Sequence, residues 1–379
     1  SINYGQLGFE DTPPDSSVAL CTTNMPVPTI ADPSEHHQVA LVDHDGSSTD
    51  VTCNWDMDAN DTMVIIKNRD NAEKWYVIDG VTGYNKYSSY NTAAATGQED
   101  ANVFAVDGTT GTLGSTLLVD NYIVEFFKAG LSASRDTTNS EGSLTGSSNS
   151  LIISANTTGG FSIVTWVGTA ANATFGHGLG AEYEYGQFKN LTDATNTKVY
   201  HVSAGLTKSS YTNGLVGFAT SSTDFNDGIG FDSDVGSVGT SADTNGSGDA
   251  QVAYLWTPIS GYSHMGQYTG NGVSNGPLIL AEIKPATSMQ HGIDSSSPPW
   301  HQRYMEADKY NQATKELLLN TTGAENSSFP VDVISNGIKL RTAEGQMNEE
   351  DGSFAYVVWG TPFGGHGGTF GGGVAPATA

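Results

Sequence analysis

The chain has 379 residues, a formal net charge of −26 from 41 acidic and 15 basic residues, and 37% hydrophobic residues. Nucleic acid and anionic membrane surfaces repel such a polyanion, and no stretch of 18 apolar residues predicts a membrane span, so we expect neither nucleic-acid binding nor membrane insertion. The 46 glycines, set among many Ser, Thr and Asn residues, are typical of short strands joined by tight turns.

Residues 1–34 predict one terminal strand of an upstream domain, within 1–10, followed by a Pro-rich linker. The chain begins at Ser1, inside the predicted strand, so we expect a processed product or a piece of a longer protein. Cys21 and Cys53 are its two cysteines. We expect two reduced, buried thiols, and a Cys21–Cys53 disulfide is the alternative.

The rest of the chain repeats one frame of strands three times, at intervals of roughly a hundred residues. An opening strand lies within 36–48, 161–172 and 262–275, and a closing strand within 122–130, 250–261 and 354–365. Each interval holds several more short apolar strands, a number that favours a sandwich over a barrel. The predicted fold class is therefore all-β, with tandem antiparallel β-sandwich or jelly-roll-like modules at 35–130, 159–261 and 262–365.

The segments between modules predict how these pack. Residues 131–158 read as a Ser/Gly-rich linker and a lead strand, so we expect module one to stand apart. Modules two and three follow each other without a linker, so we expect them to pack closely. Residues 313–325 predict one helical turn or, alternatively, a strand. Residues 366–379 form a Gly-rich tail.

One acidic stretch resembles the start of a calcium loop. Asp56, Asp58 and Asn60 place side-chain oxygens at alternate positions. The EF-hand pattern needs Gly and Glu where this chain has Asp61 and Lys67, so that type of site is excluded. A calcium site in a β-turn and a plain acidic surface loop both remain open, and no other cofactor is expected.

Aromatic residues in polar segments are the stronger lead to function. Tyr84, Tyr87 and Tyr90 lie in one such segment, and Trp300 and Tyr304 lie in a Pro-rich one. Exposed rings beside amide and carboxylate groups suit sugar binding, because a ring stacks on the apolar sugar face. The alternative is that these rings pack against a neighbouring module or subunit.

Enzyme motifs are missing from the sequence: it has no GxSxG elbow, no phosphate-binding loop and no HExxH pair. Separated carboxylates such as Glu182, Glu184 and Glu282 could converge for glycoside hydrolysis, but we expect them to face solvent. We therefore expect a non-enzymatic protein.

Several longer strings carry a resemblance. The stretch GFSIVTWVGTAANATFGHGLG at 160–180, together with LLLNTTGAEN, SNGIKLR and the terminal GGGVAPATA, resembles the repeat modules of tail-fibre-like virion structural proteins of marine bacteriophages, of the cyanophage type. The resemblance covers nearly the whole chain. Module three departs from it at 285–299, where a polar strand replaces the expected apolar one.

The resemblance implies a virion structural protein of the tail fibre, spike or head decoration type, at the extracellular virion surface. Its expected partners are other virion proteins, with a host-surface glycan as a further one, and it is expected to form a homo-oligomer, a trimer in preference. The alternatives are a calcium-assisted carbohydrate-binding adhesin and a polysaccharide depolymerase. Because the frame strands repeat and the loops do not, we expect specificity in the loops at 82–100, 221–249 and 294–306.

Overall fold

The computed structural model describes residues 29–93, 98–214, 217–221, 223–225, 231–294, 299–305 and 312–362. The predicted strand and most of the linker at 1–34, as well as the Gly-rich tail, lie outside these residues. The fold is all-β with antiparallel sheets stacked as sandwiches, which confirms the predicted fold class. No helix in these ranges has the length and apolar character that a membrane span requires.

The first lobe contains two stacked sheets. Its main sheet has the order β1-β9-β3-β4, and its outer sheet the order β2-β8-β7. Pro33–Glu35 forms a 3-10 turn before β1, and β5 pairs with β6 beside the main sheet. The strands are β1 His37–His44, β2 Thr49–Thr52, β3 Asn60–Asn68, β4 Tyr76–Asp79, β5 Lys86–Tyr87, β6 Gln98–Glu99, β7 Phe104–Asp107, β8 Thr110–Leu113 and β9 Asp120–Leu131.

The second lobe repeats this plan with three added strands in its main sheet, one at one edge and two at the other. Its main sheet has the order β10-β11-β18-β13-β14-β15-β16, and its outer sheet pairs β12 with β17. The elements are a 3-10 turn at Ser132–Ser134, α1 Gly146–Asn149, β10 Ile152–Asn156, β11 Phe161–Val167, β12 Ala173–Gly176, β13 Tyr185–Asn190, β14 Lys198–His201, β15 Lys208–Tyr211, β16 Ala219–Thr220, β17 Val235–Val238, α2 Ala242–Asn245 and β18 Ala250–Trp256.

The third lobe has a main sheet of order β19-β27-β21-β22-β24 and an outer sheet of order β20-β26-β25-β23. Its elements are β19 Ser263–Thr269, β20 Leu278–Leu280, β21 Ile283–Gly292, β22 His301–Tyr304, β23 Gln312–Ala313, β24 Leu317–Leu318, β25 Val331–Ile334, β26 Gly337–Leu340, α3 Gly345–Asn348 and β27 Ser353–Pro362. The segment 313–325 thus contributes short strands, and the helical alternative is wrong.

The three main sheets share one topology. In each, the opening strand pairs with the closing strand, which pairs with the second and then the third long strand. The pairing register also matches: Phe127, Trp256 and Trp359 occupy the same place on the three closing strands, opposite His37, Phe161 and Ser263 on the opening strands. The polar stretch from residue 285 lies in β21, in the position of β3 and β13, so the third lobe keeps the frame despite its composition.

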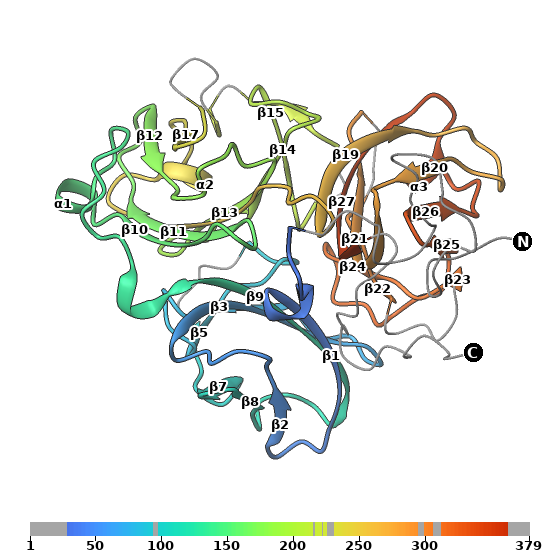
Figure 1. Ribbon diagram of the computed structural model, residues 1–379, viewed down its shortest axis with the longest axis horizontal. Coiled ribbons are helices and arrows are strands. Elements are labelled where there is room, and N and C mark those ends of the chain that lie inside the picture. The colour runs from blue at the N-terminus through green and yellow to red at the C-terminus, as the bar shows by residue number, and fades with distance from the viewer. Residues whose placement is uncertain are drawn as a thin grey trace, which may run out of the picture.

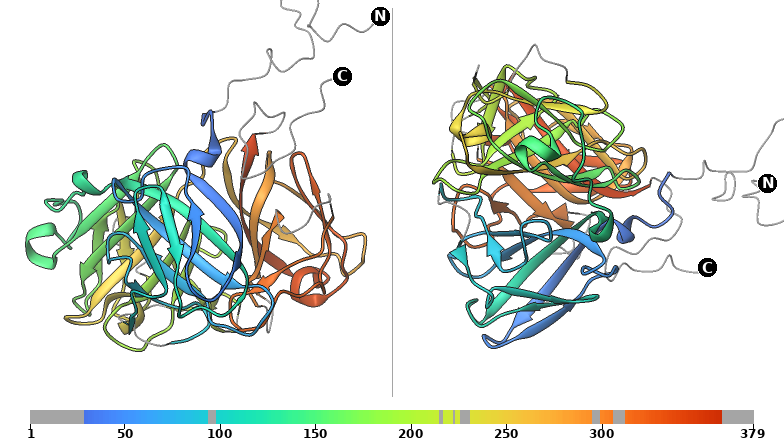
Figure 2. Two further views of the ribbon diagram at one scale, coloured as in Figure 1. Left: turned by 90° about the horizontal axis from the view of Figure 1, so that it is seen from below. Right: turned by 90° about the vertical axis from the view of Figure 1, so that its left-hand side faces the viewer.

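The lobes surround one central hydrophobic core (Figure 1). The inner faces of all three main sheets contribute to it, and the views of Figure 2 show the lobes packed side by side. Phe127, Trp256 and Trp359 contact one another there, with ring centroids 5.4, 4.9 and 5.7 Å apart. We call this arrangement a pseudo-threefold, because equivalent residues of three lobes meet at its centre.

Two sequence predictions about packing are therefore wrong. Module one does not stand apart, since Phe127 packs directly on both tryptophans. The segment 131–150 is not a free spacer, because Leu144 is buried in the second lobe and Asp136 pairs with Ile153. This segment, which we call the strap, lies along the surface of the second lobe, and its polar composition reflects that position. The apolar contacts between lobes come from strands outside it.

Candidate functional site

The predicted aromatic platform lies in the interior. Tyr87, Tyr90, Trp300 and Tyr304 are at most 7% exposed, and Tyr84 is half-buried. The expectation of exposed rings is therefore wrong for these four, and no ring face is open to a sugar there. Tyr87 lies inside the first sandwich, whereas the other three belong to the central core.

Three of these aromatics contact a neighbouring lobe. The Tyr90 hydroxyl donates to Gln187 Oε1 at 2.8 Å, and the Tyr304 hydroxyl donates to Glu125 Oε2 at 2.9 Å. Trp300 packs edge-on against Phe218 of the second lobe. The polar neighbours that suggested exposure make short-range bonds instead, as Ser89 does to Asn91 at 2.7 Å.

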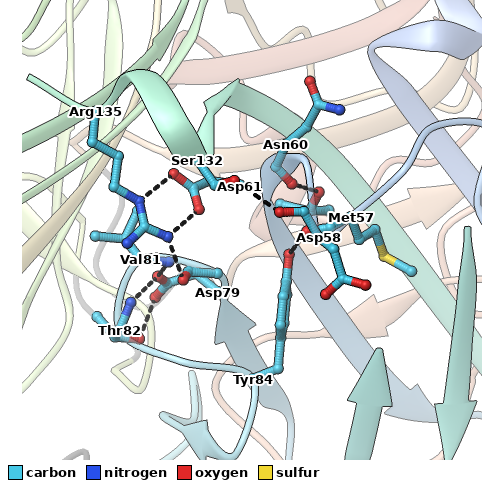
Figure 3. Close-up of polar contacts among 12 residues, drawn as sticks. Met57, Asp58, Asn60, Asp61, Asp79, Val81, Thr82, Tyr84, Ser132 and Arg135 are labelled. Atoms are coloured by element: carbon cyan, nitrogen blue, oxygen red, sulfur yellow. Dashed lines mark hydrogen bonds and ion pairs between the residues drawn. The ribbon is translucent and has the colours of Figure 1, made fainter. Parts of the chain in front are cut away.

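The predicted calcium loop is an exposed turn held by its own backbone. Figure 3 labels two of its residues, Asp58 and Asn60. Asp56 Oδ1 accepts the amides of Asp58 and Ala59 at 2.9 and 3.0 Å, and Asp58 Oδ2 accepts the amide of Gly108 at 2.8 Å. The Asn60 side chain donates to the Asp56 carbonyl at 2.8 Å. Among the residues that the structure describes, no three His, Cys, Asp or Glu side chains gather as a metal site would require. The calcium site stays a prediction.

Beside this turn, an ion pair ties the first lobe to the strap that follows it. Arg135 Nε donates to Asp61 Oδ2 at 2.7 Å, and Arg135 Nη2 donates to the other Asp61 oxygen and to the Gly80 carbonyl (Figure 3). The Asp61 side chain is almost fully buried. Such a two-pronged guanidinium–carboxylate contact fixes direction as well as distance, so it sets how the chain leaves β9.

A buried polar contact closes each of the three boundaries between lobes. The residues that make it, Asp79, His201 and Tyr304, occupy one equivalent register position, opposite Met63, Tyr185 and Thr287. The boundary contacts are Tyr254 hydroxyl to Asp79 Oδ2 at 2.8 Å, His201 Nε2 to the Tyr356 carbonyl at 3.0 Å, and Tyr304 hydroxyl to Glu125 Oε2 at 2.9 Å. The first lobe thus contacts the second, the second the third, and the third the first.

Glu125, at the boundary between the third and first lobes, has three side-chain partners. It is fully buried, and its carboxylate contacts His37 Nε2 at 2.8 Å, Gln302 Nε2 at 3.0 Å and Tyr304. Sequence reasoning missed it, although a signal was present: one carboxylate stands in the apolar strand YIVEFF. A charge in such a strand needs buried partners.

His201 and Asp79, which close the other two boundaries, have shifted pKa values. Burial lowers the pKa of His201 to about 4. Its Nδ1 accepts the Ser203 amide at 3.1 Å and its Nε2 faces a carbonyl, so the ring is held neutral with the proton on Nε2. Burial raises the pKa of Asp79, against the hydrogen bonds from Thr82, Tyr254 and Val81 that favour its carboxylate.

The dipeptide Lys-Asn occurs at 67–68 in the first lobe and at 189–190 in the second, and it has a structural role in both. Asn68 Nδ2 donates to Asp120 Oδ2, and Asn190 Nδ2 donates to Asp249 Oδ2, both at 2.8 Å. The preceding lysines, Lys67 and Lys189, are buried, and burial lowers the pKa of each to about 8. Each ammonium donates to backbone carbonyls: Lys67 bonds to Asn68 and to Thr322 of the third lobe, and Lys189 bonds to Thr195.

An open hollow of about 350 Å³ lies between the first two lobes. Val81, Val167, Leu191 and Ala250 are among its apolar lining residues, and Lys86 is its charged one. None of its described lining residues is a carboxylate, so these do not form the paired acids of a glycosidase. Glu182 and Glu282 are exposed and lie on different lobes, as expected of solvent-facing residues, whereas Glu184 is half-buried, which raises its pKa.

Cys53 is a buried thiol in the core of the first lobe, and burial raises its pKa to about 12. Such a thiol is unreactive at neutral pH. Cys21, its predicted alternative partner, lies outside the described residues.

No curated protein resembles the chain significantly. A family model described as a domain of unknown function, DUF7483, matches residues 32–361. One model therefore spans all three lobes, from the turn before β1 into the last strand, β27. The chain belongs to the DUF7483 family.

Proposed function

We propose that this protein is a non-enzymatic structural protein of a bacteriophage virion, a tail fibre, spike or head decoration that displays β-sandwiches at the particle surface. The observation that carries the proposal is the closed ring of three lobes around Phe127, Trp256 and Trp359. Together with the sequence resemblance to tail-fibre-like modules, it favours a body built for display over one built around a catalytic pocket.

The physical basis is rigidity. Each lobe contacts both of the others through aromatic side chains and at least one buried polar contact, so none can rotate without exposing such a contact. Leaving a buried hydrogen-bonding group unpaired costs about 1–3 kcal/mol, more for a charged one. The ring therefore holds the outer sheets and their loops in fixed directions, where they meet a neighbouring virion protein or a host-surface glycan.

The ring also bears on the number of copies. Fibre proteins commonly reach threefold display by trimerising, which multiplies weak contacts. Here one chain supplies three equivalent sandwiches. We propose that this single chain is the trimer-like unit, so light scattering should give a mass near 39.7 kDa. A mass three times larger would instead support the homotrimer expected from the resemblance.

The direct test is localisation. Antibodies against the folded protein, applied to intact particles of the phage that encodes it, should label one defined place on the tail or capsid in electron micrographs. Absence of the chain from purified particles would refute the virion role. Release of reducing sugar from host polysaccharide by the purified protein would refute the non-enzymatic one.

A further inference from the structure

The outer sheet of each lobe begins with an equivalent edge strand: β2, β12 or β20. Their central residues Val51, Phe175 and Ile279 point into the sandwich, and the residues on either side lie on the outer face. Those outer residues differ between the lobes. They are Asp50 and Thr52 on β2, Thr174 and Gly176 on β12, and Leu278 and Leu280 on β20.

The three edge strands share the same alternation of residues that do and do not hydrogen-bond to the neighbouring strand. The ladder bonds of Cys53 to the Thr109 carbonyl, His177 to the Asp234 carbonyl and Leu340 to the Pro277 carbonyl fix which pairs exchange hydrogen bonds. Since bonded and unbonded pairs alternate in an antiparallel ladder, the amide and carbonyl of Asp50, Thr174 and Leu278 all face the outer edge. An unprotected edge of this kind is a template for another strand.

The first two lobes protect this edge in different ways. In the first, Asp50 is exposed and places a charge there. In the second, the strap residues Gly142–Leu144 lie along β12. The amides of Ser143 and Leu144 donate to the Thr174 carbonyl at 3.0 and 2.8 Å, and Ser143 Oγ accepts the Thr174 amide at 3.0 Å. Leu144 is 1% exposed as a result.

Among the residues that the structure describes, the third lobe shows neither device at Leu278, while the neighbouring Leu280 carbonyl accepts the Tyr356 hydroxyl at 3.3 Å. Leu278 and Leu280 are 47% and 54% exposed on β20, and Val273 in the loop before it is 52% exposed. Within the described part of the chain, β20 is the terminal strand of its sheet. We call Val273 and β20 together the β20 edge. It is apolar at the position where the first lobe is charged and the second is covered.

We propose that the β20 edge binds an extended segment of another protein, added as a strand as Gly142–Leu144 is added to β12. The strap shows the kind of occupant that the edge takes: extended backbone with an aliphatic side chain. Because the chain carries a net charge of −26, a positively charged segment is favoured and a second copy is opposed. This surface does not depend on the proposed virion role.

A synthetic peptide of sequence KVTLTVK tests the proposal. Titrated into the intact protein, it should bind and slow hydrogen exchange of the backbone amides in 273–282. Replacing both leucines, Leu278→Thr with Leu280→Thr, should weaken binding at least tenfold. Val119→Thr, at an even more exposed aliphatic residue in the first lobe, should leave it unchanged. A peptide N-methylated at alternate residues should also fail to bind, because strand addition needs its amides.

The opposite results are equally clear. Absence of binding at millimolar peptide, equal binding to the double variant, or equal binding of the N-methylated peptide would each overturn the proposal. Concentration-dependent dimerisation of the protein alone, lost in the double variant, would identify the occupant as a second copy and overturn the assigned partner. Matching melting temperatures of the double variant and the parent protein establish that both are folded.

Discussion

The inner and outer sheets of this molecule have diverged to different degrees. The inner sheets differ in strand number at their edges, but they keep one order of four strands, one register and one aromatic position across the three lobes. The outer sheets have different numbers of strands, and their equivalent edges carry an aspartate, a covered threonine or an exposed leucine. Packing among three neighbours constrains a side chain from every side, whereas a sheet facing solvent is free to change. Contact specificity should therefore lie in the outer sheets, and cooperativity in the inner ones.

The largest expected effect on stability comes from removing a tryptophan side chain from the central core. Trp256→Ala should destabilise the protein by about 3–5 kcal/mol, because it removes a large buried ring that contacts both other lobes. Hydrogen exchange should then accelerate in strands of all three lobes. The matched control is Phe126→Ala, in the separate core of the first lobe. In that variant, faster hydrogen exchange should be concentrated in the first lobe. The same exchange pattern in both variants would contradict the separation of the central core from the core of the first lobe.

Removing the Glu125 carboxyl should be nearly as costly. Glu125→Ala leaves His37, Gln302 and Tyr304 facing a buried gap, so we expect a loss of about 3 kcal/mol in chemical denaturation. Glu125→Gln keeps part of the hydrogen bonding and should cost less. Glu282→Ala, at an exposed glutamate, should change stability by less than about 0.5 kcal/mol. A cost for Glu125→Ala no greater than that of this control would show that the carboxylate is not needed at the boundary.

His201 should make stability depend on pH. Its folded pKa of about 4 lies below the unfolded value of 6.5, so the unfolded state binds more protons between these values. The stabilisation is complete above pH 6.5 and is lost as pH falls toward 4. It amounts to something on the order of 3 kcal/mol. His201→Gln should flatten the stability profile in this window relative to the parent protein, whereas the half-buried His264→Gln should alter it less. Parallel profiles for His201→Gln and the parent would contradict the assignment.

The smallest expected effect concerns calcium. Because the acidic oxygens around Asp56 already accept backbone amides, we expect EDTA to leave the melting temperature unchanged. A drop on EDTA treatment that added calcium restores would revive the calcium-assisted adhesin. Asp58→Ala would then locate the ion.

The sequence could predict the sandwiches but not their arrangement. Strands such as Phe161–Val167 and Ala250–Trp256 were recognisable from aromatic and β-branched residues. The inner sheets are buried on both faces, however, as β3 shows, so no alternation marks the side that meets the other lobes. The packing of Phe127 against two distant tryptophans was therefore beyond a residue-by-residue analysis.

The prediction that the site aromatics are exposed was wrong for a related reason. Tyr90 and Trp300 stand among Ser, Asn and Pro residues, which suggest a surface loop. Those polar groups are satisfied locally, and the rings beside them fill the boundaries between lobes. Glu125, His201 and Asp79, which close the boundaries, could be suspected only as isolated polar residues in or beside apolar strands. Their partners lie between about 155 and 180 residues away along the chain.

The central claim is that three lobes form one body rather than a string of modules. A protease site inserted between Ser140 and Glu141, both exposed, would cut the strap between the first lobe and the other two. After cleavage, the two fragments should elute together from a sizing column at the mass of the intact chain and separate only in denaturant. Elution of the first lobe as an independent folded fragment would contradict the closed pseudo-threefold.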